Sequence, residues 1–178
     1  MPHIDVPHQR PGIRGLMATK PSSGRALGQL AEQLLRGESP LTVGERELIA
    51  AYVSSRNETR YCTGSHSAAA AHTLSGGDYT VVDAVKRDLA TAPVSEKLRA
   101  LLELAGHVQI SGLAVTEEHI AAARAAGADD EAVHDTVLIA AAFCMYNRYV
   151  DGLAAITPDD PAVYDEIGEN LASKGYLS

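Results

Sequence analysis

Aromatic side chains are scarce in this chain. Trp is absent, Phe occurs once, and aromatic residues make up 4% of the 178 residues. Apolar residues nevertheless reach 46%, close to the usual share in soluble globular domains. The hydrophobic core must therefore be built mainly from aliphatic side chains and alanine. A chain of this length can bury one sizeable core, and two domains of ordinary size would be cramped in it.

Clusters of positive charge are also missing. The chain has 15 Lys and Arg against 23 Asp and Glu, which gives a formal net charge of −8 at pH 7. Such a charge repels a phosphate backbone, and no run of Lys and Arg with interleaved aromatic residues offers a local exception. We therefore expect no nucleic-acid partner.

No apolar run is long enough to cross a bilayer. The longest, Val137 to Met145, is far shorter than the roughly 20 residues that a spanning helix needs. Prolines and charges occupy residues 1–16, where a signal peptide would need a continuous apolar stretch. We expect no membrane partner and a cytoplasmic location. The two cysteines, Cys62 and Cys144, are too few and too far apart for a disulfide framework, so a functional cysteine would be a thiol.

The spacing of apolar residues predicts an all-α fold. Thr42 and Glu45 have the spacing of a capping box, and Ser95 is a second N-cap signal. No segment alternates with period two, so no strands are expected. We predict an extended N-terminal arm over residues 1–20 and one helical domain over 21–178, with a buried hub in its longest helix. Helices are expected over 27–37, 43–56, 61–74, 81–90, 96–108, 117–127, 129–156 and 162–173.

The two helices on either side of a turn at Asn57-Glu58 carry three chemically suited residues. Glu47 shares one face of the first helix with small side chains. Cys62 and His66 lie one turn apart on the second helix, again among small neighbours. If the two helices pair, the hairpin brings the carboxyl, the thiol and the imidazole together.

This grouping suits thiol chemistry. An ordinary thiol, with a pKa of about 8.5, is mostly protonated at neutral pH, and a helix N-terminus or a nearby proton acceptor favours the thiolate. His66 could exchange a proton with Cys62 while Glu47 orients the imidazole. A thiolate there could attack the O–O bond of a peroxide and become a sulfenic acid. The alternatives are a Cys62 that only fills the core and a metal site, although His72 lies about 240° around the helix from His66.

The hairpin resembles the core of the alkylhydroperoxidase D-like (AhpD-like) / carboxymuconolactone decarboxylase superfamily, in its uncharacterised peroxidase-related branch. Peroxidase members carry a Glu, a CxxC motif, and a His four residues after the second Cys. Glu47, Cys62 and His66 fall at those spacings, whereas Thr59 stands in place of the first Cys. The similar pattern continues over residues 95–108 and 115–153, including the pair Asn147-Arg148. The resemblance covers residues 20–155.

The resemblance implies an AhpD-like helical bundle that assembles as a dimer, trimer or hexamer. In members with both thiols, the second Cys reacts with peroxide and the first resolves the sulfenic acid. Thr59 cannot form that disulfide, so the resemblance implies a one-cysteine enzyme in which Cys62 reduces small organic hydroperoxides and an external thiol is the reductant. Thr59 could still hydrogen-bond a water near the site. No cofactor and no metal are expected.

Two other functions stay open on the sequence. One is a decarboxylase-like proton transfer by His66 and Glu47 without thiol chemistry. The other is a non-catalytic helical module that oligomerises. We expect Cys144 to pack in the core of the longest helix. Arg148 could pair with a carboxylate near the site or across a subunit interface, or lie on the surface.

Overall fold

The structure, a computed structural model, describes residues 1–177 and is helical throughout, without strands in that range. This confirms the predicted all-α fold. Within these residues none of the helices is both long and apolar enough to cross a lipid bilayer. The elements are η1 (Pro7–Gln9), α1 (Gly12–Thr19), α2 (Pro21–Arg36), α3 (Val43–Arg56), α4 (Arg60–Ser75), α5 (Thr80–Arg87), α6 (Glu96–Ile110), η2 (Gly112–Ala114), α7 (Glu117–Ala125), α8 (Asp130–Gly152) and α9 (Pro161–Lys174).

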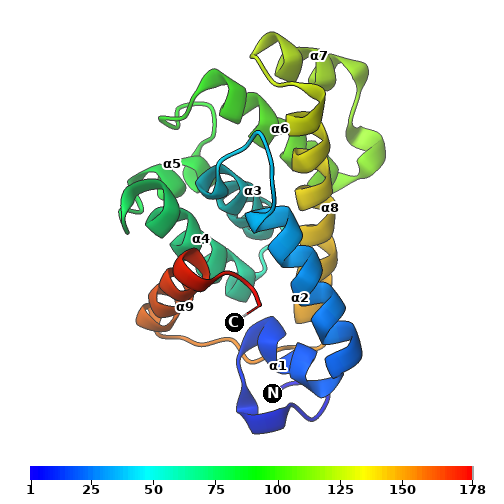
Figure 1. Cartoon of the computed structure of the whole chain (residues 1–178), viewed down its shortest axis with the longest axis vertical. Coiled ribbons are helices and arrows are strands. Elements are labelled where there is room, and N and C mark those ends of the chain that lie inside the picture. Colours follow the sequence, from blue (N-terminus) through cyan, green and yellow to red (C-terminus); the bar gives the residue numbers. More distant parts are fainter. Residues whose placement is uncertain (178) are drawn as a thin grey trace.

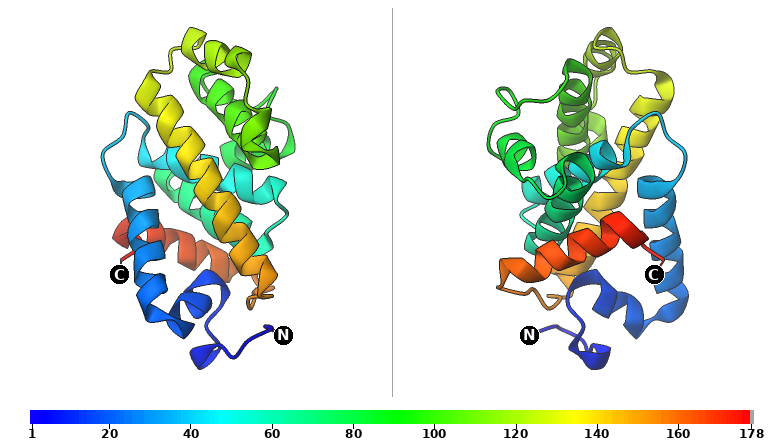
Figure 2. Two further views of the ribbon diagram at one scale, coloured as in Figure 1. Left: turned by 90° about the vertical axis from the view of Figure 1, so that its right-hand side faces the viewer. Right: turned by 60° about the vertical axis from the view of Figure 1, so that its left-hand side comes forward.

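Helix α8 runs along the length of the molecule, and the other helices pack around it and around the α3–α4 hairpin (Figure 1). Helix α9 lies across α4, while α1 and α2 close the end of the bundle that holds the N-terminus (Figure 2). Helices α6 and α7 lie toward the opposite end, and α5 packs beside α3 and α4. After α9, residues 175–177 return to the space between α2, α4 and α9, so segments from both ends of the chain meet over the hairpin.

The hairpin forms as its capping residues predict. The Glu45 amide donates to Thr42 Oγ1 at 3.2 Å, and the Thr42 amide donates to Glu45 Oε2 at 2.8 Å, so the capping box fixes the start of α3. Helix α3 ends at Arg56, and Glu58 reverses the chain with a φ of 58°. Helix α4 then begins at Arg60 and ends at Ser75, and its C-cap residue Gly76 has a φ of 64°.

Small residues allow α9 to approach α4 very closely. The alanines Ala68 and Ala69 of α4 are fully buried, and Gly168 of α9 lies directly on them. A Cβ at residue 168 would come within 2.3 Å of the Ala68 Cβ and 2.6 Å of the α4 backbone. This contact fixes α9 on the hairpin and so determines where the chain continues at Gly175.

The prediction of an extended arm over residues 1–20 is wrong for residues 12–19, which form α1. Leu16 on this helix is fully buried in a cluster with Val6, Tyr61 and Val150. Prolines and glycines hide the helical period in this segment, and the apolar contacts that stabilise the helix come from α4 and α8. Such contacts override weak local propensity.

The central part of α8 is largely buried, as predicted for the hub of the bundle. Ile139, Phe143 and Cys144 are buried, as expected for Cys144. Leu138 and Met145, however, are 40% and 43% exposed, so one apolar stripe of the helix faces outward. The helix ends at Gly152 rather than continuing to residue 156.

We expect Gly168→Ala to destabilise the protein by about 1–3 kcal/mol, because the added methyl group overlaps the α4 backbone and must push α9 away. Gly152→Ala is the matched control: it adds the same methyl group to a helix where nothing lies within 4 Å. Urea unfolding of both variants measures the difference. Equal stability of the two variants would show that α9 does not depend on this close contact.

Candidate functional site

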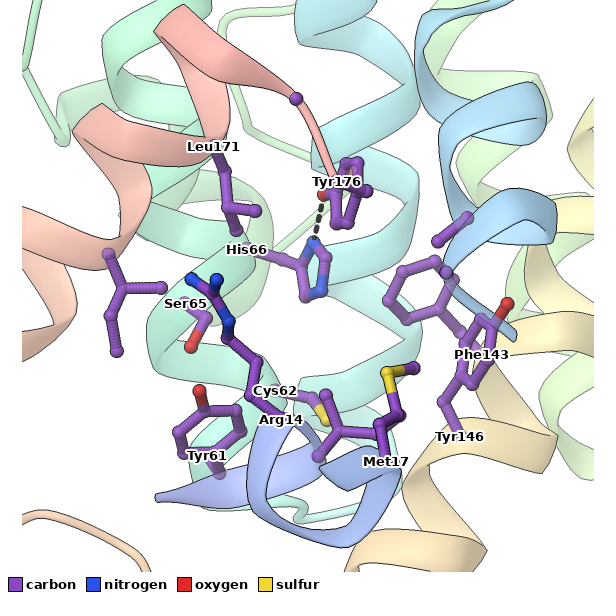
Figure 3. Close-up of a pocket in the computed structure, with 15 residues that line it drawn as sticks. Arg14, Met17, Tyr61, Cys62, Ser65, His66, Phe143, Tyr146, Leu171 and Tyr176 are labelled. Atoms are coloured by element: carbon purple, nitrogen blue, oxygen red, sulfur yellow. Dashed lines mark hydrogen bonds between the residues drawn. The ribbon is translucent and has the colours of Figure 1, made fainter. Parts of the chain in front are cut away.

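Cys62 and His66 line one cavity of about 80 Å³ (Figure 3). The two side chains come from α4, and α1, α2, α8, α9 and the C-terminal segment supply the remaining walls. Most of the lining is apolar, including Ile13, Phe143 and Leu171. The cavity is large enough for several waters or a small organic group.

Glu47 binds the His66 ring at Nδ1. Its carboxylate is fully buried, and Oε2 lies 2.8 Å from His66 Nδ1. The other oxygen, Oε1, accepts a hydrogen bond from the Tyr176 hydroxyl at 2.6 Å and lies 2.7 Å from Nη2 of Arg36. The structure therefore brings Glu47, Cys62 and His66 to one place, in the arrangement that the hairpin suggested.

The surroundings of Glu47 keep it ionised. Burial by itself acts to raise the pKa of the carboxyl, but the hydrogen bond and charge of His66 outweigh it, together with Arg36 and the Tyr176 hydroxyl, and the pKa of Glu47 is lowered. An ionised, buried carboxylate with three donors around it is a fixed acceptor for the imidazole.

His66 is held in one orientation. Because Glu47 accepts from Nδ1, the network places a proton on Nδ1, and Nε2 is then the nitrogen without a proton whenever the ring is neutral. The ring stacks with Tyr176 at an interplanar angle of 10°, and Phe143 packs edge-on with ring centroids 4.6 Å apart. In Figure 3 the nitrogen away from Tyr176 faces the cavity that Cys62 also lines. Nε2 can therefore accept a proton from a group inside the cavity.

The thiol of Cys62 is protonated, in contrast to the thiolate expected from its place in the first turn of α4. Burial raises the pKa of Cys62 to about 12; a hydrogen bond from Asn147 acts in the opposite direction, and the negative charge of Asp151 adds to the rise. The helix N-terminus and the imidazole are local features of the sequence, whereas burial of the sulfur depends on the tertiary fold. The packing of α1 and α8 over the sulfur removes water from it and has the larger effect.

Thr59, the fourth predicted site residue, lies apart from the other three. It is the N-cap residue of α4, and its hydroxyl donates to the Asp151 carboxylate. Rather than the cavity of Cys62 and His66, it lines a separate polar cleft together with Asn57, Arg148 and Asp151. A water bound to the Thr59 hydroxyl would therefore lie in this polar cleft and not in the cavity of Cys62 and His66.

The predicted pair Asn147-Arg148 divides into two roles. Asn147 is buried beside Cys62, accepts a hydrogen bond from Asn57 at 2.8 Å and donates to Ser54 at 3.1 Å. This amide network fixes the hairpin turn against α8. Arg148 is exposed and donates to the Cys144 carbonyl one turn back on its own helix.

Two site residues gave no signal in the sequence. Arg36 is the last residue of α2, and Tyr176 lies beyond the last helix. The Tyr176 amide donates to Glu32 at 2.6 Å, and the preceding Gly175 has a φ of 72°, which turns the chain back over the hairpin. Both contacts with Glu47 depend on tertiary packing, so no local pattern could have identified them.

Among residues 1–177, no group of three or more His, Cys, Asp and Glu side chains is placed to hold a metal ion. The second histidine of α4, His72, binds Asp165 instead, with Nε2 at 3.0 Å from the carboxylate.

No family model and no curated protein matches the sequence. Solved structures do match. A peroxidase-related protein from Ralstonia eutropha, described as an alkylhydroperoxidase AhpD core, is 27% identical over 89% of this chain and 81% of its own, with a TM-score of 0.78. An uncharacterised peroxidase-related protein from a Silicibacter species is 28% identical over 87% and 78%, with a TM-score of 0.77.

A third similar structure is a cysteine-to-alanine variant of a debrominase in complex with 2,3,4-tribromopyrrole. It is 22% identical over 88% of this chain and 82% of its own, with a TM-score of 0.72. At that identity the likeness concerns the fold alone. The two peroxidase-related structures agree with this one over most of each chain and in the all-helical architecture. This agreement supports an AhpD-like superfamily assignment for the chain.

Proposed function

We propose that this protein is a thiol-dependent peroxidase that reduces small organic hydroperoxides, with Cys62 as nucleophile and His66 as acid and base. The observation that carries the proposal is an apolar cavity lined both by the thiol and by an imidazole that a buried carboxylate orients. The similarity to peroxidase-related proteins supports the same class of activity.

The protonated state of Cys62 determines the order of events. Because burial raises the pKa of the thiol, the proton must leave as the sulfur attacks, and Nε2 of His66 is the acceptor in the cavity. Glu47 stabilises the imidazolium that forms. The sulfur bonds to the terminal peroxide oxygen, the O–O bond breaks, and the departing alkoxide takes the proton from His66. The products are an alcohol and a sulfenic acid on Cys62.

The protein then needs an outside reductant. Thr59 supplies no thiol, and Cys144 does not line the cavity. The Cys144 sulfur instead accepts a hydrogen bond from the Asn57 side-chain amide at 3.7 Å. In the proposed cycle one external thiol condenses with the sulfenic acid, releasing water and leaving a mixed disulfide. A second external thiol breaks that disulfide, which restores Cys62 and releases the oxidised reductant.

A proton-transfer enzyme of the lactone decarboxylase type is the second candidate. The protonated thiol and the complete network of Glu47, His66 and Tyr176 favour it, because such chemistry needs only the imidazole. A non-catalytic oligomeric module is the third. Assembly as a dimer, trimer or hexamer and a cytoplasmic location stay predictions.

The pKa of Cys62 can be tested by alkylation. At a pKa of about 12 only about one thiol in 10⁵ is ionised at pH 7, so the rate of Cys62 alkylation by iodoacetamide should rise about tenfold per pH unit between about pH 7 and 10. Peptide mass spectrometry separates the Cys62 adduct from that of Cys144. A rate that levels off below about pH 8 would contradict a buried, protonated thiol.

The peroxidase proposal is tested by cumene hydroperoxide consumption with dithiothreitol as the reductant. We expect Cys62→Ser to abolish turnover and His66→Ala to lower it about a hundredfold, because the base is lost. Cys144→Ser is the matched control and should retain turnover. Full turnover in Cys62→Ser would reject the proposal. If the wild-type protein instead decarboxylates a γ-lactone acid and Cys62→Ser keeps that activity while His66→Ala loses it, the second candidate is correct.

The Tyr176 hydroxyl should act through Glu47. Tyr176→Phe removes one donor to Oε1, and we expect kcat for hydroperoxide reduction to fall about tenfold with little change in KM, since a hydrogen bond to a charged group is lost. Tyr79→Phe is the matched control, because that hydroxyl binds the exposed Asp165. If kcat is unchanged in Tyr176→Phe, or falls equally in both variants, the Tyr176 hydroxyl does not act on catalysis through Glu47.

A further inference from the structure

The two reactive side chains of the cavity are almost inaccessible from outside. Cys62 is 3% exposed and His66 is 8% exposed, so even water has little access to either group. A molecule larger than water can reach the sulfur only if part of the cavity wall moves. This requirement holds for whichever reaction the cavity carries out.

The helices of the wall are tied to the core of the protein. The Tyr146 hydroxyl on α8 donates to the Leu27 carbonyl of α2 at 3.0 Å. Leu16 of α1 is fully buried, and Gly168 brings α9 directly onto the α4 backbone. Moving any of these helices away from the cavity would expose apolar core surface to water, which is costly.

The segment after α9 is the exception. Among the described residues that line the cavity, Gly175 and Tyr176 are the two that lie outside the helices. We call residues 175–177 the C-terminal strap. The Tyr176 amide holds it to Glu32 and the Tyr176 hydroxyl holds it to Glu47, both at 2.6 Å. In Figure 3 Tyr176 lies next to His66, at the point where the chain leaves α9.

Gly175 has the geometry of a hinge. Its amide still caps α9 by donating to the Leu171 carbonyl at 3.0 Å, so the strap begins at a fixed point. Its φ of 72° and ψ of −158° lie in a region that is essentially restricted to glycine. Leu177, two residues later, is 63% exposed, so the strap can swing outward about Gly175 without leaving the core of the protein.

The closed strap also completes the base. The Tyr176 ring stacks on His66, and its hydroxyl donates to Glu47. Burial and the charge of Glu47 hold the pKa of Tyr176 well above its ordinary value, so the hydroxyl keeps its proton and stays a donor. When the strap leaves, Glu47 loses this donor and His66 loses the ring that covers it. Access to the cavity is therefore linked to assembly of the base.

We propose that the C-terminal strap is a gate that opens about Gly175 to admit molecules to Cys62 and closes to return the Tyr176 hydroxyl to Glu47. The base is then complete only around an enclosed substrate, from which closure has removed water. The gate itself follows from the burial of Cys62, and its effect on hydroperoxide reduction rests on the proposed function.

The gate is tested by the rate at which N-ethylmaleimide alkylates Cys62 in the full chain at pH 8, followed by peptide mass spectrometry. We expect Gly175→Ala to raise this rate at least about tenfold, because alanine disfavours the closed backbone conformation. Its Cβ would also lie 2.6 Å from Oε2 of Glu32 and displace that anchor. Gly127→Ala is the matched control: Gly127 also has a positive φ, 95°, and nothing lies within 4 Å of the added methyl group. It should leave the Cys62 rate unchanged.

Cys144 separates opening of the strap from a general loss of stability. It is buried in the same chain but does not line the cavity, so Gly175→Ala should leave its alkylation at the wild-type rate. An equal rise at Cys62 and Cys144 would overturn the gate, and so would an equal rise at Cys62 in Gly175→Ala and Gly127→Ala.

Glu32→Ala gives a second variant, which releases the strap at its other anchor. It removes the acceptor of the Tyr176 amide, and we expect Cys62 alkylation to rise about three- to tenfold. Glu38→Ala is its matched control, because it makes the same change in net charge on an exposed residue. Wild-type rates at Cys62 in both Gly175→Ala and Glu32→Ala would overturn the gate.

Alkylation involves no peroxide, so its outcome separates from that of the proposed function. If the strap variants expose Cys62 and the wild-type protein consumes no hydroperoxide, the gate stands and the peroxidase proposal fails. If cumene hydroperoxide is reduced and the strap variants alkylate at the wild-type rate, the peroxidase proposal stands and the gate is wrong. Where both hold, Gly175→Ala alkylates faster and yet reduces hydroperoxide with a lower kcat, because the open strap withdraws Tyr176 from Glu47.

Discussion

Glu47 is a carboxylate with no exposure to water, and its burial constrains the rest of the site. A buried charge costs several kcal/mol unless nearby donors and opposite charges compensate it. Here the compensation comes from Arg36 at the end of α2, His66 on α4 and Tyr176 after α9. Three consecutive helices, α2, α3 and α4, and the segment after α9 must therefore meet at one carboxylate, which couples formation of the site to completion of the fold.

Burial also determines the protonation state of Cys62, the thiol that lines the cavity. Removing water from Cys62 raises the pKa of the thiol, so the resting thiol is neutral and a poor nucleophile. Reactivity depends on a proton acceptor at the correct place, and the carboxylate behind His66 supplies that acceptor by fixing the ring. Under the proposed function, such a site favours hydroperoxides that fill the apolar cavity and bring the O–O bond between sulfur and imidazole.

The sequence predicts the local part of this arrangement well. The capping box at Thr42 sets the start of α3, and the spacing of Cys62 and His66 places both on one face of α4, because these features depend on residues within one or two turns. The protonated thiol, the contacts of Tyr176 and the helix that contains Leu16 could not be predicted. Each depends on packing between segments that no short pattern relates.

The orientation of His66 by Glu47 is the central claim, and the tautomer of the imidazole tests it most directly. Long-range ¹H–¹⁵N correlation spectra of the resting protein at about pH 8, where an ordinary histidine is neutral, report which ring nitrogen carries the proton. The account predicts a protonated Nδ1 and a free Nε2 for His66, and loss of that preference in Glu47→Gln. A proton on Nε2 in the wild-type protein would contradict it.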